Sequence, residues 1–469
     1  MGVRERLDRA VLIAFAIVAA LGSGCARPGE GALIVTTNDV VAKTSPCGCH
    51  TPKGGFARRA AFLDSVRAER HDVLALDAGG FFPTIEDERD AGVFTLGSMA
   101  RMGTAAAGVG PGELRFGYSF LREHARAAGI ALLAANLEQR DTHAPGFERW
   151  RIFTTSGVPI GVFGLMLEAS DRGPARDSLV ATEAENAARA AVDSLRAAGA
   201  RVIVLLSQLG GPGGDSLVAR VPGIDLLVAG GGMVPIRPDA RRIGRTVVID
   251  GGSQGWQVGV AEVRPGAAGA RTRIDAKTVV LGPEYAMQPA MAASVKAFED
   301  SLNARMRVRT AAFAPITPGG SPGAHYVGMS NCVKCHAGEY AQWQATAHAR
   351  AWKTLADQRK ESTPECVPCH VTALGEPGGY QTTDDAARFG NVQCEACHGR
   401  GSDHGQWVKN GNAVAESTCR GCHTSATSPT FSLALYRPHV VHVPPPGLKP
   451  LPETPAARLM RKGHEPHGR

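Results

Sequence analysis

The sequence has little of what would assign a chain of 469 residues to several common classes. Aromatic residues make up 6% of it and charged residues 20%, and no block of Lys and Arg with interleaved aromatics occurs. The formal charge of +7 therefore does not indicate a nucleic-acid partner. The apolar run Ala10–Leu21 is shorter than the roughly 20 residues that a membrane span requires. What remains is a globular chain long enough for two or three domains.

Cysteine, by contrast, is abundant and strongly patterned. Eight of the 11 cysteines lie in four copies of C-x-x-C-H, the attachment signature of c-type haem. In this signature two thiols bind the vinyl groups of one porphyrin, and the histidine that follows is the proximal iron ligand. The pattern predicts four covalently bound haem c groups and electron transfer. The copies are Cys332-x-x-Cys335-His336, Cys366-x-x-Cys369-His370, Cys394-x-x-Cys397-His398 and Cys419-x-x-Cys422-His423.

Structural zinc is the alternative interpretation of these motifs, because pairs of C-x-x-C also bind zinc. Zinc does not require a histidine directly after the second cysteine, whereas every copy here has one. The spacing and the histidine position therefore favour haem.

The N-terminus predicts export. A basic start with Arg4 and Arg9 precedes the apolar run, which has the length of a signal-peptide core. The run ends in Leu21-Gly-Ser-Gly-Cys25, which resembles a bacterial lipobox. We expect residues 1–24 to be a lipoprotein signal peptide and Cys25 to be lipidated, which anchors the protein in a membrane on the periplasmic side. Ala26 favours the outer membrane, and an ordinary cleaved signal is the alternative.

The segment from Cys25 to about residue 283 alternates apolar strands with helices, which predicts an α/β domain with a covered sheet. A hairpin is expected around Ser156 and Gly157. A helix over Pro289–Met306 and a Pro/Gly-rich linker follow within residues 284–324. The haem region then covers residues 325–443, and a Pro-rich, basic tail that is expected to be disordered covers 444–469. The predicted strands are Ala32–Asp39, Asp72–Gly80, Ile130–Asn136, Arg151–Thr155, Val158–Leu165, Arg201–Gln208, Ile224–Ala229, Val247–Asp250, Gln257–Val263 and Thr272–Leu281, and the helices Gly55–Arg70, Val93–Met102, Tyr118–Ala128 and Ala184–Ala198.

Low-spin haems need a second axial ligand, and the remaining histidines of the haem region are the candidates. His348 is placed on an expected helix over Gly338–Leu355, and His404 follows the third motif through a glycine-containing segment. His442 follows the fourth motif, with His439 as a competitor. Large apolar residues are sparse here, so we expect the porphyrins to form much of the core.

The haem region resembles the tetrahaem cytochrome c family of nitrifying bacteria, in which this module relays electrons from hydroxylamine oxidoreductase. The resemblance rests on the segments Tyr326–His348, Val392–His404 and Ser428–His442. It implies that His348, His404 and His442 are distal ligands and that one iron lacks a distal protein ligand. We assign that open iron to the haem of His370, with His325 as a residue that could fill the gap.

The front domain resembles the calcineurin-like metallophosphoesterases, in particular their 5'-nucleotidase branch. The resemblance rests on Thr37-Asn-Asp39, Asp77-Ala-Gly-Gly80, Gly110-Pro-Gly-Glu113, Ser207-Gln-Leu-Gly210 and Gly230-Gly-Gly-Met233. It implies a phosphoesterase-type sandwich, but the family's two metals would have lost their ligands here. Of these ligands only Asp39 remains, and the other ligand positions hold Val41, Gly80, Pro111, Gly112, Gln208, Gly231 and Met233. Two-metal hydrolysis is therefore not expected, and the loops Gly210–Gly214 and Gly230–Gly232 are interpreted as turns that could also bind an anion.

Cys47-Gly-Cys49-His50 is a separate cluster in the loop after the first predicted strand. A strained disulfide, a metal or redox site, and idle thiols all remain open for it.

These observations predict an exported multihaem cytochrome with unidentified redox partner proteins and a phosphoesterase-like scaffold or docking domain. The alternatives are a multihaem oxidoreductase that acts on a small molecule at an open iron, or a residual 5'-nucleotidase-like phosphoesterase.

Overall fold

The structure is a computed structural model. It describes residues 31–47, 51–70, 72–83, 89–232, 239–250, 252, 254–266, 272–311, 323–358, 360–361, 363, 366–405, 413–424, 427–428 and 431–442. The expected signal peptide with Cys25, most of the linker, Cys49 and His50, and the Pro-rich tail lie outside the described residues. Within the described ranges no helix is both long and apolar enough to cross a membrane.

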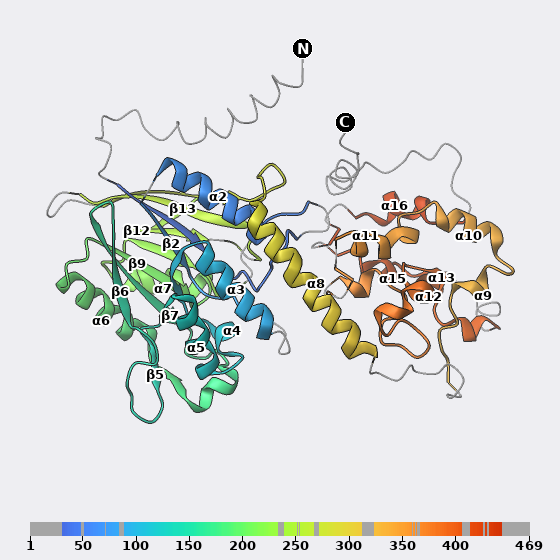
Figure 1. The fold of residues 1–469 in the computed structure, drawn as a ribbon, viewed down its shortest axis with the longest axis horizontal. Coiled ribbons are helices and arrows are strands. Elements are labelled where there is room, and N and C mark those ends of the chain that lie inside the picture. The colour runs from blue at the N-terminus through green and yellow to red at the C-terminus, as the bar shows by residue number, and fades with distance from the viewer. Residues whose placement is uncertain are drawn as a thin grey trace, which may run out of the picture.

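Two six-stranded sheets form the centre of the first part of the chain (Figure 1). The first has the order β14-β13-β1-β2-β3-β4 and is parallel from β1 to β4. The second has the order β11-β12-β10-β9-β7-β6 and is parallel from β12 to β7. The strands are β1 (Ala32–Thr37), β2 (Val73–Asp77), β3 (Thr104–Gly108), β4 (Ala131–Leu133), β6 (Trp150–Thr155), β7 (Val158–Met166), β9 (Val202–Gln208), β10 (Leu226–Ala229), β11 (Arg241–Ile243), β12 (Thr246–Asp250), β13 (Gln257–Arg264) and β14 (Arg273–Val280), and β5 (Leu137–Gln139) and β8 (Leu179–Ala181) form a separate pair.

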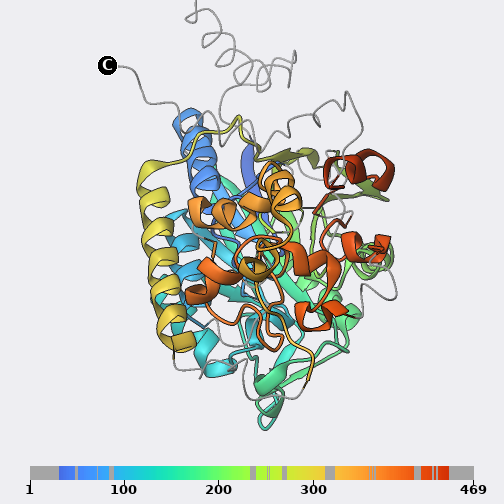
Figure 2. The same cartoon turned by 90° about the vertical axis from the view of Figure 1, so that its right-hand side faces the viewer.

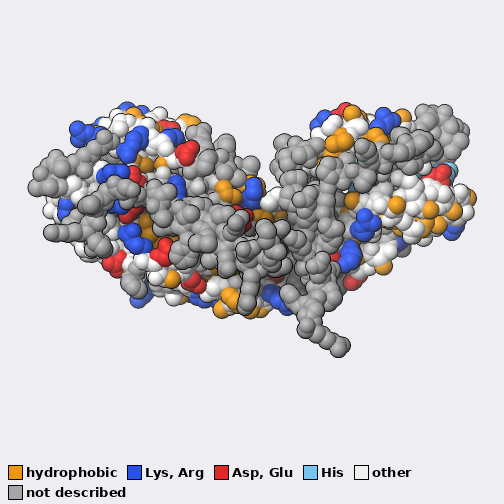
Figure 3. All heavy atoms as spheres, turned by 90° about the horizontal axis from the view of Figure 1, so that it is seen from above, with side chains coloured by type: hydrophobic (Ala, Val, Ile, Leu, Met, Phe, Trp, Pro, Cys, Tyr) orange, Lys and Arg blue, Asp and Glu red, His pale blue; other side chains and the backbone are white. Residues whose placement is uncertain are grey.

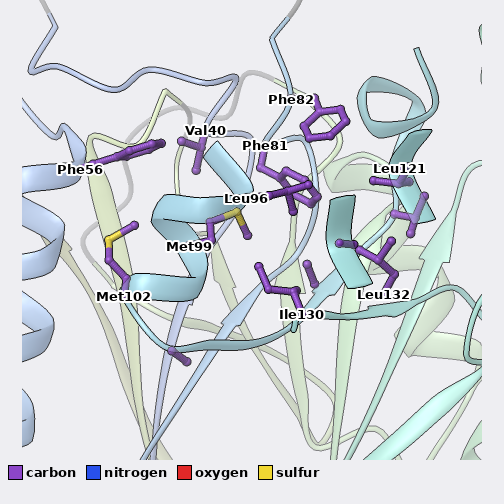
Figure 4. Packing of buried hydrophobic residues seen from close by; sticks show 14 of the residues in the cluster. Val40, Phe56, Phe81, Phe82, Leu96, Met99, Met102, Leu121, Ile130 and Leu132 are labelled. Atoms are coloured by element: carbon purple, nitrogen blue, oxygen red, sulfur yellow. The ribbon is translucent and has the colours of Figure 1, made fainter. Parts of the chain in front are cut away.

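Helices cover the outer faces of both sheets, which gives four layers. One apolar cluster fills the space between the sheets, with Ile34, Leu206 and Val228 among its members. A second lies between the first sheet and its covering helices (Figure 4). A third joins the second sheet to its own helices. The helices are α2 (Phe56–Glu69), α3 (Arg89–Arg101), α5 (Tyr118–Ala128) and α8 (Pro289–Ala311) over the first sheet, α6 (Ala184–Ala197) and α7 (Gly211–Arg220) over the second, and a short α4 (Pro111–Leu114).

The apolar runs of the sequence explain this layering. Strand β9 is buried along its whole length, as expected for a parallel strand that is covered on both faces. The predicted α/β class and the predicted hairpin, which is formed by β6 and β7, are confirmed. Strand β3 was not predicted from the sequence, and neither was α7.

The second part of the chain is helical and is built from short segments (Figures 1 and 2). Its apolar cluster is small and consists of Leu355, Val367, Val371, Tyr380 and Phe389 with a few partly buried neighbours. The segments are α9 (Met329–Cys332), α10 (Ala337–Gln344), η2 (His348–Arg350), α11 (Ala351–Gln358), η3 (Val367–Cys369), η4 (Thr383–Asp385), α12 (Ala386–Phe389), α13 (Cys394–His398), η5 (Gly401–Asp403), α15 (Glu416–Arg420), α16 (Leu433–Tyr436) and η6 (Arg437–His439).

The prediction of one continuous helix over Gly338–Leu355 is wrong. Helix α10 ends at Gln344, where the Thr346 hydroxyl donates to the carbonyl oxygen of Trp343 at 2.7 Å. The Trp343 indole in turn donates to the Val392 carbonyl oxygen at 2.7 Å. The break between α10 and η2 separates His348 from the face of α10.

The two parts meet beside α8 and the loop after β1, and together they form two lobes (Figures 1 and 3). The Lys360 ammonium of the helical part donates to the Pro46 carbonyl oxygen at 3.0 Å. Glu299 on α8 accepts a hydrogen bond from Thr44 at 3.1 Å, and the positive charge of Lys360 also acts on it. The loop of residues 44–46 is thus held between α8 and the helical part.

Candidate functional site

Each C-x-x-C-H motif forms a helical turn or lies at the end of one. In the first and fourth motifs the backbone N–H of the histidine donates to the carbonyl oxygen of the first cysteine, at 3.0 and 2.9 Å. Residues three and four positions apart share one side of a helical turn. Both thiols and the imidazole of a motif can therefore face the same ligand.

Three of the four motif histidines are each paired with a histidine outside the motifs. The ring centroids of His336 and His404 lie 6.1 Å apart. The distance is 6.2 Å for His423 and His348. It is 6.0 Å for His398 and His442. All three distal candidates named from the sequence are therefore placed opposite a motif histidine.

His370, in the second motif, is different. Its Nδ1 lies 2.6 Å from the Ala351 carbonyl oxygen and 3.1 Å from the Thr354 hydroxyl. Among the described residues, no second imidazole is placed opposite His370. His325, the residue considered for this position, bonds through Nδ1 to the Gly323 carbonyl oxygen at 3.2 Å.

Other imidazoles also have a polar partner at Nδ1. His423 Nδ1 lies 2.9 Å from the Ser428 hydroxyl, and His442 Nδ1 lies 3.3 Å from the side-chain oxygen of Gln342. A partner at one ring nitrogen fixes the orientation of the ring and leaves Nε2 for a metal. Burial lowers the pKa of His348 and of His423, which favours the neutral form that binds metals.

Cysteines of different motifs lie against each other. The thiols of Cys332 and Cys394 lie close enough for each to shift the pKa of the other, which makes the first motif a neighbour of the third. Cys369 and Cys422 join the second motif to the fourth in the same way. Burial raises the pKa of the Cys397 thiol, and the nearby thiol of Cys419 adds to this rise. The third motif is therefore a neighbour of the fourth. The motifs are thus neighbours in the spatial order first, third, fourth, second.

Asp39 lies at the end of β1 in the α/β domain, where its carboxylate is held by uncharged donors. The Asn38 amide donates to it at 2.8 Å and the Gln208 amide at 3.4 Å. The Gly231 backbone N–H donates to both oxygens, at 3.1 and 3.3 Å. Burial raises the pKa of Asp39, and these hydrogen bonds oppose the rise.

The space around Asp39 is closed. A Cβ atom at Gly80 would lie 2.3 Å from the nearer Asp39 oxygen, so no aspartate fits there without movement of the site. A Cβ at Gly110 would lie 2.5 Å from the Gln208 side-chain oxygen. In the described part of the chain, no three His, Cys, Asp or Glu side chains are grouped so that they could hold a metal ion.

Two further carboxyl groups are buried next to this position. Glu113 accepts backbone N–H donors from Gly80, Phe81, Phe82 and Gly110 at 2.7–3.0 Å. Asp77 accepts from the Thr37 hydroxyl and from the Gly79 N–H. Burial raises the pKa of Glu113 to about 7 and that of Asp77 to about 6, although these hydrogen bonds lower both values. Both carboxyl groups hold loops together at the ends of strands.

The expectation of a glycine-rich turn at Gly210–Gly214 is wrong. Helix α7 begins at Gly211, with proline in its first turn. Proline is well tolerated in the first turn because its missing N–H has no partner within the helix there. Gly230 does end β10 in a turn, and its carbonyl oxygen accepts the Gly210 N–H at 3.2 Å.

Cys47 lies beside Trp256, whose indole N–H donates to the sulfur at 2.7 Å. The Gln254 side-chain oxygen lies 3.6 Å from the same sulfur. Cys49 and His50 fall outside the described residues, and the three interpretations of this cluster stay open.

The sequence places Gln208 at one of the expected ligand positions but does not predict that its amide donates to Asp39. Sequence reasoning also missed Glu395, a buried carboxylate inside the third motif. An acidic residue between two haem-binding cysteines was the only available signal.

Comparisons with known proteins agree with both parts of this description. Residues 331–399 match the family described as cytochrome c554 and c-prime. Cytochrome c-554 of Nitrosomonas europaea is 33% identical over 125 residues, which cover 23% of this chain and 53% of that protein. The chain thus spans about half the length of this curated relative.

The α/β part is similar in fold to solved structures of a 5'-nucleotidase and a sulfate thiohydrolase. A 5'-nucleotidase precursor from Thermus thermophilus aligns with a TM-score of 0.54 and 25% identity, over 59% of this chain and 60% of that one. The sulfate thiohydrolase SoxB from the same organism has the same TM-score at 17% identity, over 63% of this chain and 64% of that one. The protein therefore joins a nucleotidase-type fold to a helical region that is similar to cytochrome c554.

Proposed function

We propose that this chain is an exported multihaem c-type cytochrome that transfers electrons through four covalently bound haems. The observation that carries the proposal is the set of three histidine pairs with centroids 6.0–6.2 Å apart. Each pair joins one motif histidine to one histidine outside the motifs. Such a pattern is expected if each pair binds one iron from opposite sides.

The spacing fits a metal ion between the rings. An imidazole nitrogen lies about 2.0–2.1 Å from a first-row metal that it binds, so two rings on opposite sides have centroids about 6 Å apart. The eight motif cysteines would hold the porphyrins, with the four motif histidines as proximal ligands and His348, His404 and His442 as distal ligands. When bound, haem supplies a one-electron couple at each motif.

The contacts between cysteines of different motifs support a relay. They place the first motif next to the third, the third next to the fourth and the fourth next to the second. Electrons would then pass along this order, with His336 at one end and His370 at the other. Redox partner proteins would bind near these ends.

A reductive titration of the holo-protein tests the relay. We expect each chain to take up four electrons, one for each motif, and all four haems to re-oxidise together when an acceptor is added. Uptake of fewer than four electrons at full haem loading would contradict the proposal.

An oxidoreductase that acts at an open iron is a second candidate, favoured by the environment of His370. This histidine has an orienting partner on Nδ1 and no imidazole opposite it among the described residues. A low-spin haem at the second motif that does not bind carbon monoxide after reduction would eliminate this candidate.

For the α/β domain we propose a scaffold or docking role without two-metal hydrolysis. The Asp39 carboxylate is satisfied by neutral donors, and a side chain at Gly80 would collide with it. A glycine offers no ligand atom beyond its backbone, so the residues present do not fit a dinuclear centre.

Metal binding and hydrolysis provide the test of this role. We expect the full-length protein to bind no stoichiometric Mn²⁺ in equilibrium dialysis and to leave AMP and bis-p-nitrophenyl phosphate intact. Asp39→Asn should behave in the same way. Stoichiometric Mn²⁺ that is lost in Asp39→Asn, together with hydrolysis, would restore the phosphoesterase alternative.

Export and a lipid anchor at Cys25 complete the proposal. They are supported by the basic start, the short apolar run and the lipobox-like end of the N-terminus. The anchor would hold the protein at a membrane on the periplasmic side or at the outer membrane, within reach of membrane-bound redox partners.

A further inference from the structure

Glu395, which lies between the two cysteines of the third motif, is only 2% exposed. Its Oε1 accepts the Val327 N–H at 2.9 Å and the Gly401 N–H at 2.6 Å. Its Oε2 accepts the Gly328 N–H at 2.8 Å. A single buried carboxylate thus binds two backbone segments that are far apart in the sequence.

Both segments lead to the first haem site. Gly328 is the N-cap of α9, whose last residue is Cys332 of the first motif. Gly401 begins η5, and His404 directly follows that turn. Glu395 therefore holds two stretches of backbone in place. One leads to Cys332, and the other leads to His404, which is paired with His336.

The contact is tight. A Cβ atom at Gly401 would lie 2.4 Å from the Val327 side chain and 2.7 Å from Glu395 Oε1. Glycine is therefore required at this position for the backbone to approach the carboxylate. A second connection runs beside it, because the His325 N–H donates to the Ser402 hydroxyl at 2.8 Å.

We propose that Glu395 is a positioning residue for the haem of the first motif, although it belongs to the third. This inference rests on the proposed haem binding and adds that one carboxylate sets the separation of His336 and His404. Its carboxylate is buried directly after Cys394 in the chain and beside the segment that leads to Cys332. It therefore favours the oxidised form of the haems attached there.

The physical reason is the cost of unpaired N–H groups. Loss of the carboxylate removes the acceptor of three backbone N–H donors, and a buried donor without an acceptor destabilises the conformation that holds it. Glutamine does not replace it well, because the amide nitrogen is a donor and would face another donor. The His404 segment is then free to move away from His336.

The test is the holo-protein with Glu395→Gln, compared with Glu416→Gln, an exposed glutamate that precedes the fourth motif. We expect Glu395→Gln to keep the wild-type haem count but to convert one low-spin haem largely to high spin. The substitution should also raise the midpoint potential of a haem that is attached at Cys332 or Cys394. His404→Ala identifies the signal of that haem, and the double variant should show no further loss of low-spin signal.

Gly401→Ala gives an independent readout if Glu395→Gln folds poorly. It crowds the same contact without a change in charge, so we expect the same haem to lose low-spin signal. Wild-type spectra for both variants would overturn the positioning role. A wild-type protein without the expected haem count would instead overturn the proposed function, so the two failures are distinguishable.

Discussion

Replacement of His348 by alanine is expected to convert one low-spin haem of this protein to a high-spin haem. His348 lies beside His423, with ring centroids 6.2 Å apart, and burial lowers the pKa of its imidazole. Removal of the ring would leave His423 as the one histidine held toward a haem bound at the fourth motif. Electron paramagnetic resonance of the oxidised protein measures the change.

His439→Ala is the matched control for this experiment. His439 lies close to His442 in the sequence, yet the structure pairs His442, not His439, with His398. We expect His439→Ala to keep the wild-type spectrum and His348→Ala to keep the wild-type haem count. A high-spin signal in the control, or an unchanged spectrum in His348→Ala, would show that the pairs are not axial ligands.

The second large effect concerns folding. Protein made without haem attachment, with all eight motif cysteines replaced by serine, is expected to have an unfolded C-terminal part and a folded α/β domain. The reason is the small apolar cluster of the helical part, which consists of five buried side chains. The α/β domain has three extensive clusters. A helical part with so little buried apolar surface cannot offset its conformational entropy without a ligand.

Limited proteolysis and circular dichroism measure this difference. We expect rapid cleavage after about residue 323 in the serine variant, a stable fragment that contains the two sheets, and protection of the whole described region in the holo-protein. A helical part that resists proteolysis without haem would mean that protein side chains alone form its core.

Much of the two sheets could be predicted because several of their strands are apolar on both faces. Strands β9 and β10 are examples, with every residue buried. Strand β3 is not predictable from its sequence, Thr-Ala-Ala-Ala-Gly, because only one of its residues is β-branched. Helix α7 was interpreted as a turn because glycine and proline fill its first turn, where tertiary packing of Leu217 and Val218 decides the outcome.

The site was only partly predictable for a related reason. Motif spacing is local, so the attachment cysteines and their histidines can be identified from the sequence. Which distal histidine faces which motif depends on packing between remote segments, as in the pair of His348 and His423. The role of Glu395 depends on backbone donors 67 and 68 residues earlier in the chain, which no local pattern encodes.

The surroundings of Asp39 show the same limit. The sequence shows glycine at 80 and 231 and methionine at 233, the positions on which the proposed absence of a two-metal site rests. Only the three-dimensional arrangement shows that the Gln208 amide donates a hydrogen bond to the Asp39 carboxylate. The collision of a side chain at Gly80 with Asp39 is the physical argument behind the proposal that no two-metal site forms here.

The measurement that tests the central claim most directly is a pyridine haemochrome count combined with electron paramagnetic resonance of the oxidised holo-protein. We predict four haems per chain, one for each motif, with three low-spin signals from the three histidine pairs and a distinct fourth signal from the haem of His370. A count below four, or fewer than three low-spin signals at full loading, would contradict the account.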